Sequence, residues 1–292
     1  RELIPLLSGR YHIIAPDYLG SGYSDRPDPS TQKYSFNLLA TYVAGLLETL
    51  NVQRYTLYMQ DFGAPVGFRM LLNNSQELEA LIIQNGNAYL DGLTPSRQAF
   101  FKTAKEDNST LQLDKLYGFT GQQAIVNKQY LRDVQSAPET MNPDSRSHDL
   151  HFLHSDKDYY NNLLDYPLWQ AYLRRYQPPT LIVWGQNDPA FIADGAKAYL
   201  RDVPNAELHL LDAGHFAVEE KPVEIAKHIT NFMHKLRAKN NMPLEQWANQ
   251  SSEFKEYRAQ QKLRFTLSAV WWVNRLFVIG KIFTVGYEST AG

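Results

Sequence analysis

The chain has 292 residues, a formal net charge of −2 and no cysteine. This length is enough for one large domain or two smaller ones with a buried core. The absence of cysteine excludes disulfides, thiolate metal sites and a cysteine nucleophile. The nearly balanced charge offers no basic footprint, so we expect no nucleic-acid partner.

Short apolar runs alternate with stretches of helical periodicity along the chain. We predict strands at residues 11–15, 54–59, 80–84, 180–184 and 207–211, and helices at residues 36–50, 64–72 and 193–200. Strands that are apolar throughout are typical of a parallel sheet that is buried on both faces. The expected fold class is therefore α/β, a mostly parallel sheet flanked by helices.

Two segments depart from this alternation. Residues 89–178 are helical, polar and rich in tyrosine, and we interpret them as a helical cap inserted into a core of residues 1–88 and 179–236. Caps of this kind commonly carry substrate contacts. Residues 237–292 form an atypical C-terminal extension, in which Arg275 and Lys281 interrupt the apolar run. A docked helix or a loose tail is favoured there over a helix lying on a membrane surface.

The start of the chain carries no secretory signal, so we expect a cytoplasmic protein. Its first residues have the pattern of the middle of an amphipathic helix. We therefore expect a further segment before Arg1.

Three chemically reactive side chains each follow a predicted strand closely: Asp61, Asp188 and His215. Ligands of parallel α/β sheets bind at the carboxyl ends of the strands. A carboxylate beside the first N–H groups of a helix is held as an anion and can attack an electrophilic carbon. A histidine oriented by a second carboxylate can activate water. A helix cap or a turn explains either aspartate alone, but the three together favour a catalytic site.

Other chemistries find little support in the sequence. No Gly-x-Ser-x-Gly motif, dinucleotide-binding loop or phosphate-binding loop occurs. His148, His151 and His154 recur every three residues, and we interpret them as a solvated face of a cap helix instead of a metal site. We expect no metal and no cofactor, and the expected partners are a small-molecule substrate and water.

The residues around these positions resemble the α/β-hydrolase superfamily, and within it the aspartate-nucleophile branch of epoxide hydrolases and haloalkane dehalogenases. The resemblance covers roughly residues 1–236. Its strongest parts are residues 15–25 (APDYLGSGYSD), 60–65 (QDFGAP), 178–188 (PPTLIVWGQND) and 214–216 (GHF).

The resemblance implies a role for each candidate residue. Asp61 would attack carbon to form an alkyl ester, His215 would activate the water that hydrolyses the ester, and Asp188 would hold the imidazole. The backbone N–H of Phe62 would form half of the oxyanion hole. Cap tyrosines would protonate an epoxide oxygen, and the candidates are Tyr159, Tyr160 and Tyr166.

Three features depart from the family pattern. Phe62 stands where haloalkane dehalogenases usually have a tryptophan that binds halide, although Gln60 resembles that subgroup. The His-Gly oxyanion loop is absent, together with the strand before it, so we expect unpaired backbone between strands 11–15 and 54–59. The extension from residue 237 has no counterpart. The predicted function is hydrolysis of small electrophilic substrates, and epoxides are the favoured substrate class. The alternatives are a haloalkane dehalogenase and a non-catalytic or impaired member of the fold.

Overall fold

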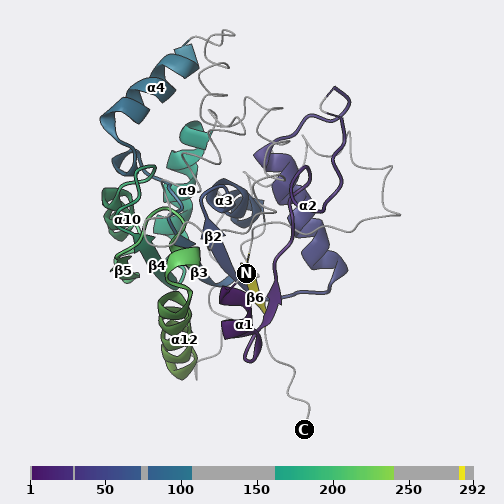
Figure 1. Cartoon of the computed structure of the whole chain (residues 1–292), viewed down its shortest axis with the longest axis vertical. Helices are drawn as coiled ribbons and strands as arrows, with labels where there is room; N and C mark the ends of the chain where they lie inside the picture. Colours follow the sequence, from purple (N-terminus) through teal and green to yellow (C-terminus); the bar gives the residue numbers. More distant parts are fainter. Residues whose placement is uncertain (1, 29, 74–77, 107–161, 240–282, 287–292) are drawn as a thin grey trace.

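The computed structural model describes residues 2–28, 30–73, 78–106, 162–239 and 283–286, and their arrangement is shown in Figure 1. Within these ranges lies a six-stranded sheet in the order β1-β6-β2-β3-β4-β5. Its strands are β1 (His12–Ile14), β2 (Tyr55–Gln60), β3 (Leu78–Gln84), β4 (Thr180–Gly185), β5 (Glu207–Leu211) and β6 (Phe283–Gly286). Strands β2 to β5 are parallel, whereas β6 is antiparallel to both of its neighbours. The predicted mostly parallel α/β sheet is confirmed.

Helices cover both faces of this sheet. They are α1 (Leu3–Ser8), α2 (Phe36–Thr49), α3 (Gly63–Asn73), α4 (Pro95–Glu106), α9 (Asn162–Tyr176), α10 (Ala193–Ala198), α11 (Ala217–Glu220) and α12 (Pro222–Lys239), with short 3₁₀ turns η1 (Leu90–Gly92) and η5 (Tyr199–Arg201). One hydrophobic cluster joins α2, α3, α9 and α10 to the sheet, and a second joins α1 and α12 to the other face. Alternate residues of β2, β3 and β4 belong to the two clusters, which is why these strands are apolar throughout.

Helix α2 shows how local sequence sets an element's ends. Its N-cap Ser35 accepts a hydrogen bond from the backbone N–H of Leu38 at 3.0 Å. Five apolar side chains at helical spacing are buried: Phe36, Leu39, Ala40, Val43 and Leu47. The helix ends at Thr49, and Asn51 beyond it has a positive φ of 55°, a conformation that asparagine tolerates.

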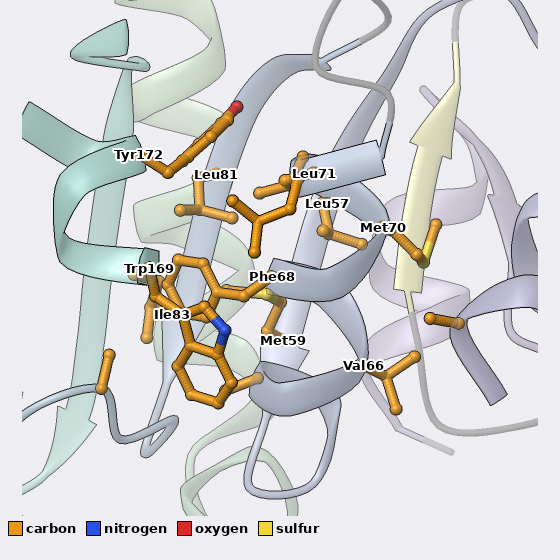
Figure 2. Close-up of a cluster of buried hydrophobic side chains, with 14 of the residues drawn as sticks. Leu57, Met59, Val66, Phe68, Met70, Leu71, Leu81, Ile83, Trp169 and Tyr172 are labelled. Carbon is orange, nitrogen blue, oxygen red and sulfur yellow. The ribbon is translucent and has the colours of Figure 1, made fainter. Parts of the chain in front are cut away.

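The core between α3 and the sheet fixes the position of the turn that precedes this helix. Figure 2 shows Phe68 of α3 beside Trp169 of α9, and their rings stack with centroids 5.0 Å apart. A Cβ atom at Gly67 would lie 2.2 Å from the sulfur of Met59 on β2, so α3 crosses this strand at close range. Because α3 is pressed against β2 on one side and α9 on the other, its first turn has little freedom to move.

Strand β6 corrects one expectation from the sequence. We expected unpaired backbone between strands 11–15 and 54–59, but β6 lies between β1 and β2 and pairs with both. Val285 is opposite Ile13 on one side and Thr56 on the other. Buried backbone N–H and C=O groups need partners, and β6 supplies them from a segment distant in sequence.

The predicted cap and extension are described only in part. Of residues 89–178, the structure describes 89–106 and 162–178, which include η1, α4 and α9. The three predicted cap histidines, two of the candidate tyrosines and the extension other than residues 237–239 and β6 lie outside the described residues. Among the helices of the described ranges, none combines the length and hydropathy needed to cross a bilayer.

Candidate active site

Asp61 lies on a sharp turn between β2 and α3. Its φ angle is +45°, which places a residue other than glycine in the left-handed region, where steric strain is expected. Small neighbours permit this turn: a Cβ atom at Gly86 would come within 3.1 Å of the Cβ atom of Ala64. The Asp61 side chain remains 32% exposed, so the strained turn presents a carboxylate that a ligand can reach.

Asp188 lies in the turn after β4, and its side chain is fully buried. One carboxylate oxygen, Oδ1, accepts the backbone N–H groups of Ala190 at 2.6 Å and Phe191 at 3.0 Å. The other oxygen, Oδ2, accepts the side-chain amide of Asn85 and the Nδ1 atom of His215, each at 2.7 Å. Four hydrogen bonds thus satisfy both oxygens of this buried side chain, and the contact with Nδ1 fixes the orientation of the imidazole.

His215 connects the two aspartates. While its Nδ1 atom contacts Asp188, its Nε2 atom lies 3.4 Å from Oδ1 of Asp61, longer than an ordinary N–H···O bond but too short for an intervening water. The backbone carbonyl of His215 accepts hydrogen bonds from the side-chain amides of Gln60 and Gln84, at 3.3 and 3.1 Å. The three predicted residues therefore meet, with the imidazole between the carboxylates.

The two carboxylates determine the charge of this imidazole. Burial alone would lower the pKa of His215, but the charge and hydrogen bond of Asp188, followed by those of Asp61, raise the pKa to about 10. For Asp61, desolvation opposes ionisation, yet contacts with His215, the Phe62 backbone N–H and the charge of Arg97 lower its pKa overall. These shifts favour a protonated imidazole beside an ionised Asp61.

Phe62 contributes to the site through its backbone. Its N–H group interacts with the Asp61 carboxylate and favours the charged form. An N–H group in this place can also stabilise negative charge that develops on the same oxygen during a reaction. The Phe62 ring packs edge-on against Phe36 with centroids 5.4 Å apart, and it carries no hydrogen-bond donor.

A cavity opens directly above Asp61. Its empty space amounts to about 370 Å³ when the adjoining open solvent is included. The lining is mostly apolar, from Phe62, Pro65, Leu93, Leu163, Trp169 and Phe191, with four polar residues, Asp61, Asn87, Asn162 and Tyr166. This combination suits a small, largely apolar ligand with one or two polar atoms.

Of the three candidate cap tyrosines, Tyr166 lines this cavity from α9. Tyr159 and Tyr160 lie outside the described residues. Tyr166 is nearly buried, and its hydroxyl oxygen accepts a hydrogen bond from the side-chain amide of Asn87 at 3.2 Å. A phenol therefore lies in the same cavity as the Asp61 carboxylate.

Two asparagines of the site, Asn85 and Asn87, were not among the candidate residues from the sequence. Asn85 has a φ angle of +44°, accepts the backbone N–H of Gly185 at 2.9 Å and holds Asp188. Asn87 lines the cavity. Both follow the carboxyl end of β3, so the rule that located the aspartates and the histidine would have located them too.

The chain is similar to known hydrolases in sequence and in fold. Residues 1–222 match the family described as the alpha/beta hydrolase fold. An uncharacterized hydrolase of Saccharomyces cerevisiae, YNR064C, is 36% identical over 244 residues, covering 78% of this chain and 82% of the yeast protein. A haloalkane dehalogenase of Mycobacterium marinum is 24% identical over 251 residues, covering 78% and 77% of the two chains. The crystal structure of haloalkane dehalogenase DbeA from Bradyrhizobium elkani has a TM-score of 0.65 at 18% identity, covering 82% of this chain and 86% of that one, a likeness of fold.

Proposed function

Because the chain belongs to the alpha/beta hydrolase fold family, we propose that it hydrolyses small electrophilic substrates, epoxides first, through an ester formed on Asp61. One observation carries the proposal: the partly exposed Asp61 carboxylate lies 3.4 Å from His215 Nε2 and lines a mostly apolar cavity. A water-activating histidine beside an attacking carboxylate is what a two-step displacement requires.

In the first step, an oxygen of the Asp61 carboxylate attacks a ring carbon of the epoxide. The carbon–oxygen bond of the ring breaks, and its electron pair stays on the oxygen, which takes a proton from a donor in the cavity. The lowered pKa of Asp61 keeps this carboxylate charged and able to attack. The product is a neutral alkyl ester of Asp61.

Formation of this ester changes the imidazole. Asp61 has lost its charge, so one of the two carboxylates that raise the pKa of His215 no longer does so. The imidazole then gives up its proton more readily, and neutral Nε2 can take a proton from water. The resulting hydroxide attacks the ester carbonyl carbon, and the oxyanion forms beside the Phe62 N–H. Collapse expels the alkoxide, which takes the proton of the newly formed Asp61 carboxylic acid and leaves as the diol; the carboxylate is restored with one oxygen from water.

The two candidate substrate classes differ in their leaving atom, which is an oxygen in an epoxide and a halide in a haloalkane. The absence of a donor on the Phe62 side chain and the Tyr166 phenol in the cavity favour an oxygen leaving group, which must be protonated. The related haloalkane dehalogenase of Mycobacterium marinum and the resemblance at Gln60 favour a halide. A haloalkane dehalogenase is therefore the second candidate.

The mass of the ester tests this proposal. With His215→Gln the ester should accumulate, and the intact protein should gain the whole mass of styrene oxide. With 1-bromobutane it should gain only a butyl group and release bromide. Asp61→Asn should show neither adduct, and its turnover should fall by at least about 10³-fold. Binding of both compounds by the wild-type protein without turnover or adduct would leave a non-catalytic member of the fold and reject the proposal.

A further inference from the structure

Asn87 connects the loop after β3 to α9 inside the cavity. The residue is 3% exposed, and its side-chain nitrogen Nδ2 donates to two oxygens: the backbone carbonyl of Tyr89 at 2.9 Å and the hydroxyl of Tyr166 at 3.2 Å. Asn87, Tyr166 and Asp61 all line the cavity. Asn87 therefore contacts the Tyr166 hydroxyl directly, and would act on a bound ligand through that hydroxyl.

The orientation of the Asn87 amide follows from its neighbours. A backbone carbonyl only accepts hydrogen bonds, so the side of the amide that faces the Tyr89 carbonyl must be the NH₂ group. The oxygen Oδ1 faces two glycines instead: a Cβ atom at Gly92 would lie 2.1 Å from it, and one at Gly195 would lie 2.8 Å from it. In the described part of the chain Oδ1 has no hydrogen-bond partner, and turning the amide over would place this oxygen against the Tyr89 carbonyl, with the loss of that hydrogen bond.

This orientation sets the polarity of the contact with Tyr166. An amide NH₂ group can only donate, so the Tyr166 oxygen must accept from Asn87. The hydrogen of the Tyr166 hydroxyl is thus directed to an acceptor other than Asn87. A carboxylate at position 87 would reverse the contact, because it would accept this hydrogen and add a second negative charge beside Asp61.

We propose that Asn87 is a positioning residue that holds the Tyr166 hydroxyl as the proton donor for the oxygen that leaves when Asp61 attacks. The inference rests on the proposed function and narrows it to substrates with an oxygen leaving group, such as three-membered cyclic ethers. The ring C–O bond breaks as the Asp61–carbon bond forms, the oxygen takes the Tyr166 proton, and the phenolate regains a proton from solvent. The later hydrolysis of the ester does not involve Tyr166.

The test measures the two steps separately in single turnovers with styrene oxide, by rapid quenching and intact-protein mass. Asn87→Asp and Tyr166→Phe should each slow ester formation by about 10²-fold or more. Tyr166→Phe and Asn87→Ala, which add no charge, should leave the rate of ester hydrolysis within about twofold of the wild-type rate. The double variant Asn87→Ala/Tyr166→Phe should form the ester no more slowly than Tyr166→Phe alone, because Asn87 acts through the phenol.

Gln170→Ala is the matched control. Gln170 also lies on α9, and it donates to the backbone carbonyl of Ala88 at 2.8 Å without lining the cavity. Its removal loosens the same loop but should change neither step. Equal slowing of ester formation by Gln170→Ala and Asn87→Asp would show a merely structural effect and overturn the assignment, as would a multiplicative loss in the double variant.

The outcomes also separate this inference from the proposed function. If the wild-type protein forms no ester with styrene oxide or 1-bromobutane, the proposed function itself fails. If it forms an ester with styrene oxide at a rate unaffected by Asn87→Asp, only the role of Asn87 fails. With 1-bromobutane, whose bromide leaves without a proton, Asn87→Asp and Tyr166→Phe should slow ester formation much less than with styrene oxide. Equal slowing with both substrates would reject the role as proton donor.

Discussion

At the residue scale, two carboxylates influence what His215 can do. Asp188 first, and Asp61 after it, raise the pKa of His215 to about 10, which favours a protonated imidazole while Asp61 is charged. If the His215 imidazole stays protonated until Asp61 has reacted, it cannot take a proton from water before the ester has formed. In the proposed mechanism, the Asp61 carboxylate would therefore be the attacking group and would also control the second step.

The two steps should therefore respond differently to pH. Ester formation needs an ionised Asp61, whose pKa is lowered, so its rate should stay constant well into the acid range. Ester hydrolysis needs neutral His215, so its rate should rise with pH by up to about tenfold per unit until it passes the pKa of His215 in the ester, which lies below about 10. Rapid-quench mass measurements from about pH 5 to about pH 9 would follow both steps. A hydrolysis rate that is flat over this range would contradict the role given to His215.

At the scale of elements, one buried arginine joins three helices near the site. Arg69 of α3 donates to Asn37 of α2 at 3.0 Å, and to Asn162 and Asp165 of α9 at 2.9 and 2.6 Å. Its guanidinium also lies 5.5 Å from the centre of the Trp169 ring. Because α9 supplies four residues of the cavity lining, this network connects the lining to α2 and α3.

Replacement of Arg69 with methionine should weaken both the fold and substrate binding. The side chain is 5% exposed, and its loss leaves several acceptors unpaired, so we expect a loss of roughly 3 kcal/mol in unfolding free energy. We also expect KM to rise more than kcat falls. Urea unfolding and steady-state kinetics would measure these effects. Lys197→Met is the control, because its ion pair with Asp194 is exposed and should contribute less than about 1 kcal/mol.

The sequence predicted correctly those features that a short stretch of consecutive residues specifies. Continuous apolar runs located β1 to β5, and the strand-end rule brought Asp61, Asp188 and His215 together. The contacts of Arg69 were not predicted, because a single arginine in an apolar helix does not indicate its partners until the positions of α2 and α9 are known. Strand β6 was missed because its partners lie more than two hundred residues away, and no local pattern reports such a pairing.

At the scale of the whole molecule, the raised pKa of His215 links the active site to stability. The folded protein binds this proton more tightly than the unfolded chain, in which the histidine pKa is near 6.5. The resulting stabilisation is fully present below about pH 6.5 and is lost as the pH rises through about 10. The lowered pKa of Asp61 acts at the other extreme, since its contribution is lost as the pH falls through that pKa.

Comparison with His215→Gln isolates this contribution. Between about pH 7 and about pH 10, the unfolding free energy of the wild-type protein should fall relative to the variant by up to about 1.4 kcal/mol per pH unit. Urea unfolding at a series of pH values would measure the difference. A difference that stays constant with pH would mean that the imidazole does not hold its extra proton in the folded state.

The left-handed backbone at Asp61 has a consequence for how this protein can change. A residue other than glycine in that conformation costs on the order of 1–3 kcal/mol, and this one also keeps an ionised group in a partly dehydrated place. Glycine or asparagine would occupy the bend more comfortably. Laboratory evolution for heat resistance alone, without selection for turnover, would therefore favour substitutions at position 61 and eliminate the reaction with them.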